Sequence, residues 1–152
     1  MAIENMNFEH TNEITVVNKP QFDAHVRLYE GYINKINEVD QELAHNPQTS
    51  QANATYSKYR GLKRGETYAM NGVILHELYF QNMGGTQAEP DEATMNRIGN
   101  GFEDFEHWKD DFIATAKASR GWAILAFDQR SRCLRNVSLD LHDYGNISLS
   151  FP

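Results

Sequence analysis

The sequence predicts an α+β fold, with a helical hairpin in its N-terminal half and a small antiparallel sheet in its C-terminal half. Through the first half, apolar residues recur at steps of three and four, which is the period of an amphipathic helix. After residue 121 the pattern changes to one compact apolar run and one alternating run, and both are typical of strands. The expected order is therefore four helices, two strands and the beginning of a third strand.

The N-terminal part is expected to consist of an extended lead-in and a first long helix. Residues 1–20 are polar and end in a proline, so we expect them to be extended. A helix is expected over residues 21–44, and it ends before Asn46-Pro47 because proline interrupts helices. The apolar residues on its inner face are Phe22, Val26, Tyr29, Ile33, Ile36 and Val39 or Leu43.

A second long helix is expected over residues 54–83, with Asn53 as its N-cap and a glycine pair after its end. It contains three glycines, and each costs about 1 kcal/mol against alanine in a helix. Their presence indicates close packing or a kink. With the first helix it is expected to form an antiparallel hairpin domain over residues 21–85. Its inner face carries Tyr56, Tyr59, Leu62, Ala69, Val73, His76 and Phe80.

Residues 86–152 are expected to form an α/β domain that is incomplete at its C-terminus. Two helices and two strands are expected, over residues 91–98, 102–119, 122–127 and 133–139. A third strand is expected to begin at residue 146 and to be truncated, which would leave an exposed sheet edge. The second of these helices is strongly amphipathic, and its inner positions are Phe105, Trp108, Phe112, Ile113 and Ala116.

Composition restricts the classes of function. The chain has 152 residues, of which 40% are hydrophobic, and a formal net charge of −7. This size fits one domain or two small subdomains, and the acidic balance argues against nucleic acid as a partner. The single cysteine, Cys133, excludes an intramolecular disulfide and a thiolate metal cluster. We interpret it as a half-buried strand residue rather than a reactive thiol.

The chain shows no sign of export or of membrane insertion. Residues 1–8 lack the charged and apolar regions of a signal peptide, and no apolar stretch approaches the length that spans a bilayer. We therefore expect a cytoplasmic protein that does not act at a membrane.

His76 is the leading candidate for a functional residue. It lies in the most apolar stretch of the chain, residues 70–80, and on a helix it shares a face with Val73 and Phe80. A buried imidazole must be hydrogen-bonded or bound to something. A structural histidine and a metal ligand both meet that requirement. The zinc-protease motif His-Glu-x-x-His does not apply, because position 80 is phenylalanine.

A second histidine, His25, gives His76 a possible partner. In an antiparallel hairpin the start of the first helix lies near the end of the second, so these two imidazoles can converge. Two imidazoles suit iron, manganese, zinc, copper or nickel, but two ligands alone do not hold a redox metal. Further ligands would have to come from elsewhere.

The sequence resembles the iron/manganese superoxide dismutases over about residues 22–152. The resemblance depends on several stretches in a particular order and spacing. They are residues 28–35 (LYEGYINK), 71–80 (NGVILHELYF) and 102–105 (FEDF), which leads through an amphipathic helix into residues 120–125 (RGWAIL). The resemblance implies the same fold that the element order predicts. It also implies superoxide as substrate, iron or manganese as cofactor, and a homodimer or higher oligomer.

The resemblance also implies roles for individual residues. In this family one histidine from each hairpin helix binds the metal, and an Asp-x-x-x-His segment supplies two more ligands. His76 matches the second-helix ligand. His25 would be the first-helix ligand after a one-residue shift, since the family position matches Ala24; without the shift, that ligand is missing. Tyr32 matches the active-site tyrosine of the hydrogen-bond network, or it only packs within the hairpin.

Two features depart from the family pattern. No residue of this chain matches the Asp-x-x-x-His ligands, which in the family follow the third strand. Family members also have a glutamine that lies outside the set of metal ligands. The corresponding stretch here is residues 141–145, and we expect Tyr144 to occupy that position. His142, in the same stretch, is either an additional ligand or an ordinary turn histidine.

We therefore expect a superoxide dismutase-like protein that is weak or inactive as this chain alone. The missing ligands would be supplied by a segment lost from the chain or by another chain. The alternative is a non-catalytic member without metal, which uses the fold for binding or assembly. A further alternative is a helical-hairpin protein whose resemblance is coincidental.

Overall fold

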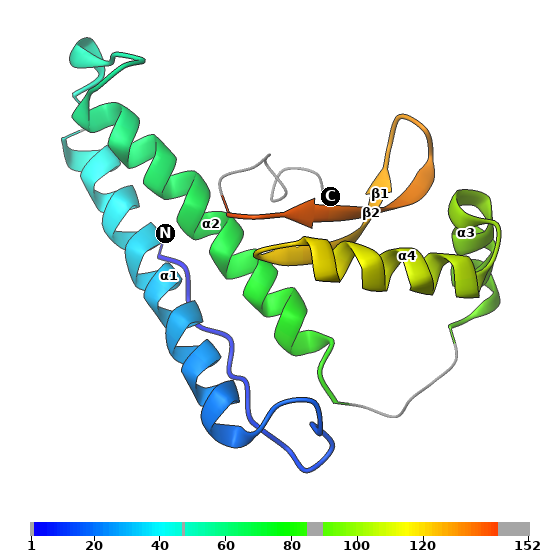
Figure 1. The fold of residues 1–152 in the computed structure, drawn as a ribbon. Coiled ribbons are helices and arrows are strands. Elements are labelled where there is room, and N and C mark those ends of the chain that lie inside the picture. Colours follow the sequence, from blue (N-terminus) through cyan, green and yellow to red (C-terminus); the bar gives the residue numbers. More distant parts are fainter. Residues whose placement is uncertain (1, 47, 85–89, 143–152) are drawn as a thin grey trace. The chain divides into compact units, whose positions relative to one another are not determined.

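A computed structural model describes residues 2–46, 48–84 and 90–142 (Figure 1). These residues form two compact units. The first contains the described residues up to 84 together with His142, and the second contains residues 90–141. The predicted third strand at residue 146 lies outside the described residues.

Helix α1 spans Lys19–His45 and begins earlier than the predicted start at residue 21. Asn18 caps it through a reciprocal pair of hydrogen bonds: its side chain accepts from the backbone N–H of Gln21 (3.0 Å), and its own N–H donates to the Gln21 side chain (3.2 Å). Proline is tolerated in the first turn because its missing N–H would have no helical partner there. Pro20 therefore lies inside the helix instead of preceding it.

Helix α2 spans Lys58–Gln81, and the predicted cap at Asn53 was wrong. Ser57 is the N-cap, and its hydroxyl accepts a hydrogen bond from the N–H of Arg60 at 3.1 Å. The side chain of Asn53 instead accepts from the N–H groups of Thr55 and Tyr56. Such a local turn competes with helix formation, so the helix begins later in the chain, at Lys58. Tyr56 consequently precedes the helix and is 89% exposed, so its predicted inner position was also wrong.

The hairpin core confirms most of the predicted inner faces. Helices α1 and α2 pack against each other (Figure 1), and a one-turn 3-10 helix, η1 (Thr49–Gln51), lies between them in sequence. The lead-in also covers the core, since Ile14 is buried and Ile3 and Phe8 pack against it. The buried residues of the two long helices in this core are Phe22, Tyr29, Ile33, Ile36, Ala69, Val73 and Phe80.

Tyr29 connects the lead-in, α1 and α2 through one buried hydroxyl. This side chain is 0% exposed. Its hydroxyl accepts a hydrogen bond from the N–H of Met6 (2.9 Å) and donates to a carboxylate oxygen of Glu77 (2.9 Å). Burial, together with Glu77, raises the pKa of Tyr29 from 10.0 to about 12.

This raised pKa predicts a loss of stability at high pH. The folded protein favours the neutral phenol, so the stabilisation is complete below pH 10 and is lost as the pH rises toward 12. A shift of this size corresponds to about 2 to 3 kcal/mol. Chemical denaturation at pH 9 and at pH 11.5 measures it. Tyr29→Phe is expected to be less stable than the unmodified protein at pH 9. Its free energy of unfolding should also fall less between pH 9 and pH 11.5. An equal fall in both proteins would contradict the assignment to Tyr29.

The second unit contains two helices and a two-stranded antiparallel sheet. Their bounds are α3 Glu92–Phe102, α4 Phe105–Ala118, β1 Trp122–Asp128 and β2 Cys133–Leu139. In the sheet, Ile124 pairs with Val137. Trp108 of α4 donates its indole N–H to the side chain of Asn136 in β2 at 3.2 Å. Both predicted strands are confirmed.

Three predictions for these helices were wrong. Helix α3 continues through Gly99 and Gly101 instead of ending at Ile98. Gly101 lies against the β2 backbone, where a Cβ would be 2.7 Å from the carbonyl oxygen of Leu134, so this glycine permits close packing and does not end the helix. Helix α4 begins at Phe105, not at residue 102, because Asp104 caps it. Its face is also less buried than predicted, since Ile113 is 43% exposed and Ala116 is exposed.

The α+β fold class is therefore confirmed, with its helical hairpin and its small antiparallel sheet. Within the described ranges, no helix combines the length and the apolar character that crossing a membrane requires.

Candidate metal centre

The candidate site is built around His76, which is only 4% exposed on the inner face of α2. Its Nδ1 lies 2.7 Å from the carbonyl oxygen of Gly72, one turn earlier in the helix. A carbonyl oxygen can only accept a hydrogen bond, so Nδ1 is the protonated nitrogen and Nε2 carries the lone pair. This arrangement fixes the ring and is the one by which proteins orient metal-binding imidazoles.

The surroundings keep His76 neutral. Burial lowers the pKa of its imidazole, and the nearby His142 and His25 lower it further, while the hydrogen bond with Gly72 acts in the opposite direction. A neutral imidazole is the form that binds a metal ion. The state of His76 near neutral pH therefore suits either a ligand or a buried structural residue.

His25, not Ala24, faces His76 across the hairpin. The His25 ring lies 6.1 Å from the His76 ring and 5.4 Å from the Tyr79 ring, centroid to centroid. Ala24 is exposed, whereas His25 is half-buried. Successive residues of a helix point about 100° apart, so these neighbours on α1 cannot both face α2.

Tyr32 contacts the same site from α1. Its ring lies 5.3 Å from that of His76 and 5.1 Å from that of His142. Burial and the adjacent Tyr68 raise the pKa of the Tyr32 hydroxyl, so it remains protonated at neutral pH. Gly72 makes this packing possible, because a Cβ there would lie 2.7 Å from the Tyr32 ring.

His142 is the residue whose position the sequence left undecided. It is 7% exposed, and its ring lies 5.9 Å from that of His76 and 4.8 Å from that of Tyr68. The side-chain amide of Asn71 donates a hydrogen bond to its backbone carbonyl at 2.6 Å. No local pattern reveals this placement, because 65 residues lie between His76 and His142 in the chain. Tyr144 lies outside the described residues.

The described residues do not form a complete metal site. His25, Tyr32, His76 and His142 lie in one cluster of ring contacts. Yet within the described ranges no three histidine, cysteine, aspartate or glutamate side chains are arranged to hold a metal ion. Imidazoles suit iron and manganese, so the chemistry of these residues fits the implied metal, but their number does not complete its coordination.

Comparison with known proteins finds relatives that cover most of this chain. No family model matches the chain. An iron superoxide dismutase of Aquifex aeolicus is 39% identical over 137 residues, which are 88% of this chain and 63% of that protein. A manganese superoxide dismutase of Haloferax volcanii is 38% identical over 131 residues, which are 84% of this chain and 63% of that protein.

A third relative is covered more completely. A manganese superoxide dismutase of Haloferax mediterranei is 38% identical over 125 residues, which are 80% of this chain and 83% of that protein. The chain thus spans less than two thirds of the length of the first two relatives and most of the third. From this identity and the α+β fold with its helical hairpin, the chain belongs to the iron/manganese superoxide dismutase family.

Proposed function

We propose that this chain provides the hairpin part of the metal site of a superoxide dismutase, with His76 as a ligand of iron or manganese. The observation that supports this most is the buried, neutral imidazole of His76, oriented by the Gly72 carbonyl and contacted by His25, Tyr32 and His142. The relatives are named superoxide dismutases with iron or with manganese, which supports superoxide as the substrate and either metal as the cofactor.

Three residues of the cluster have a proposed role. His76 and His25 present imidazoles from α2 and α1. Tyr32 holds a proton on its hydroxyl at neutral pH, since burial raises a phenol pKa whose ordinary value is already 10.0, and it can order a solvent molecule beside His76. Two superoxide ions and two protons give one dioxygen and one hydrogen peroxide. The bound metal would supply the one-electron exchange, and the residues of the chain would position solvent and protons.

We expect weak activity, or none, from the 152-residue chain alone. The described residues do not offer three ligands in a metal-binding arrangement, and a divalent ion held by two imidazoles would exchange readily. Full activity would require further ligands beyond His25 and His76.

The test is to load the protein with manganese(II) or, under anaerobic conditions, with iron(II). Bound metal is then measured by mass spectrometry and superoxide consumption by stopped flow. We expect weak binding of about one ion per chain, with little turnover. Turnover at the level of a complete superoxide dismutase would refute the expectation of an inactive chain. No binding of either ion would refute the proposed metal site.

A second candidate is a non-catalytic member that uses the fold for binding or assembly. One observation favours it: the described residues contain no group of three ligands in a metal-binding arrangement. This candidate predicts that neither ion binds and that neither raises the melting temperature. Stabilisation by manganese that increases with its concentration would exclude it, since only a ligand that binds the folded state stabilises it in this way.

We also propose a cytoplasmic location and, as the family resemblance implies, a homodimer or a higher homo-oligomer. Light scattering coupled to size-exclusion chromatography measures the oligomeric state. A mass of 17.4 kDa at micromolar concentration would show a monomer and contradict this proposal.

A further inference from the structure

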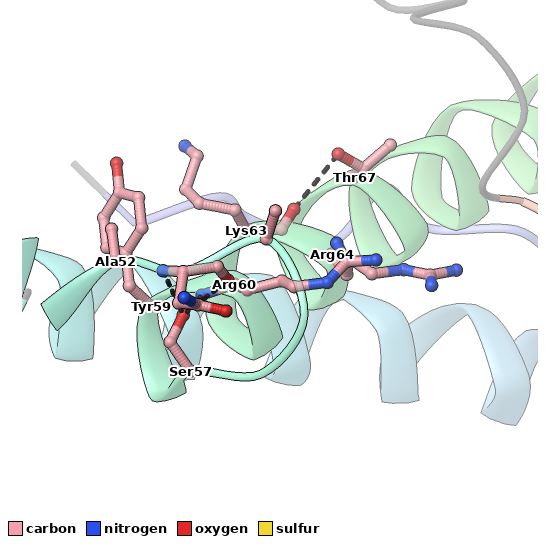
Figure 2. Close-up of a pocket in the computed structure, with 9 residues that line it drawn as sticks. Ala52, Ser57, Tyr59, Arg60, Lys63, Arg64 and Thr67 are labelled. Carbon is pink, nitrogen blue, oxygen red and sulfur yellow. Dashed lines mark hydrogen bonds between the residues drawn. The ribbon is translucent and has the colours of Figure 1, made fainter.

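A second candidate site lies in the hairpin unit, over the connection into α2 and the first turns of that helix. It is a surface pocket of about 450 Å³, which is within the usual range for small-molecule sites. The pocket is formed by residues 52–54 of the connection and by one side of α2 from Ser57 to Thr67 (Figure 2). His76, which lies farther along α2, is not part of it.

The pocket is strongly cationic although the chain is acidic. Arg60, Lys63 and Arg64 line it, and no carboxylate among the described residues does. The chain as a whole carries a formal charge of −7. Three cations around one concave surface create a local positive potential against that background, and such a potential attracts and retains anions.

Arg60 is the cation that remains available to a ligand. Lys63 forms an ion pair with Glu66, and the neighbouring Lys58 pairs with Glu42 at 2.7 Å. Within the described ranges the guanidinium of Arg60 has no such partner, although its backbone N–H is fixed by the Ser57 hydroxyl. A guanidinium offers a planar set of donors that matches the oxygens of a phosphate group.

The other residues that line the pocket indicate the type of ligand. Tyr59 provides an aromatic ring and a hydroxyl beside the cations. The Thr67 hydroxyl already donates to the Lys63 carbonyl at 3.1 Å. The side-chain oxygen of Asn53 accepts from the backbone N–H of Thr55, which leaves its amide N–H groups as donors. These donors and the cations together suit a group carrying two or more negative charges.

We propose that this pocket binds a small phosphorylated molecule, with Arg60 as the principal phosphate contact and Tyr59 beside its organic part. Lys63 and Arg64 add positive charge beside it. The site is separate from the proposed metal centre, and it requires no metal.

Isothermal titration calorimetry with pyrophosphate and with ATP tests the proposal at 50 and 200 mM salt. We expect both probes to bind, and we expect Arg60→Gln to weaken binding about tenfold or more, as for the loss of a charged hydrogen bond. Arg60→Lys is expected to recover only part of the affinity, because lysine keeps the charge but not the planar donors. Arg27→Gln is the matched control. It removes one positive charge, as Arg60→Gln does, but from an exposed position on α1, and it should change the affinity by less than about twofold.

Three outcomes would overturn the proposal. One is the absence of binding by either probe at 50 mM salt, and another is equal weakening by Arg60→Gln and Arg27→Gln, which would indicate a diffuse charge effect. The third is Arg60-dependent binding of a single-stranded oligonucleotide that is much tighter than that of ATP, since the ligand would then be a polyanion. Circular dichroism of each variant verifies folding, and an unchanged manganese content in Arg60→Gln separates this site from His76.

Discussion

Replacing His76 with glutamine is expected to abolish the binding of manganese and iron to this chain. His76 is the most buried histidine of the cluster, and its Nδ1 is held by the Gly72 carbonyl. Glutamine keeps a polar group of similar length but offers no imidazole nitrogen. Loss of a residue that merely orients a ligand costs roughly 10- to 100-fold in metal affinity, so loss of a ligand should exceed that range. Competition with a fluorescent chelator measures the change.

Two further variants show whether this effect is specific. His45→Gln removes an exposed histidine at the far end of α1, whose ring nitrogen contacts the Gln41 carbonyl, and it should leave metal affinity unchanged. His25→Gln should reduce the affinity if His25 is the α1 ligand. Denaturation of the metal-free proteins verifies that each variant is folded. Retention of metal by folded His76→Gln would show that the ion binds elsewhere in the chain.

Replacing Gly72 with alanine is expected to destabilise the hairpin by about 1 to 3 kcal/mol, the usual cost of overpacking a core. The new Cβ would lie 2.7 Å from Cγ of Tyr32 and 2.9 Å from two further ring atoms. An aromatic ring cannot yield in the way that the end of a flexible chain can, so either Tyr32 or the helix must move. The loss should exceed the gain of about 1 kcal/mol that alanine brings to a helix. Urea denaturation measures the difference.

Gly61 provides a matched control in the same helix. A Cβ at this position would meet no atom within 4 Å apart from its own helix backbone, so Gly61→Ala should stabilise the protein by up to about 1 kcal/mol. The two substitutions are chemically identical and are expected to have opposite signs. In a Tyr32→Ala background, the penalty of Gly72→Ala should disappear, because the ring that it meets is gone. A penalty that persists in that background would mean that Tyr32 is not its cause.

Much of the hairpin could be predicted from the sequence, because one face of each long helix must be apolar for the two helices to pack. That periodicity placed Phe22, Tyr29 and Ile36 in α1, and Val73 and Phe80 in α2, on the inner faces, where they are buried. The helix bounds were less predictable. Asn53 and Ser57 both have the chemistry of an N-cap, and only the local turn at Asn53 decides between them.

The candidate site could also be predicted only in part from the sequence. That His76 faces a core follows from its apolar neighbours three and four positions away, and this is a local property of the sequence. Which residues surround His76 depends instead on how the helices pack. Only the packing of α1 on α2 places His25, and not Ala24, against His76, and only tertiary structure brings His142 within 5.9 Å of it.

The three glycines of α2 show the limit of sequence most clearly. The sequence indicated that glycines inside this helix have a packing reason, but it could not separate one from another. In the structure a Cβ at Gly61 meets open space, one at Gly65 makes an ordinary contact of 3.7 Å with Val39, and one at Gly72 meets the Tyr32 ring. The sequence by itself thus determined the periodic elements and the inward direction of His76, since both depend on neighbours along the chain. Tertiary structure decided which residues surround that imidazole and which glycine is indispensable, since both depend on how closely two helices approach.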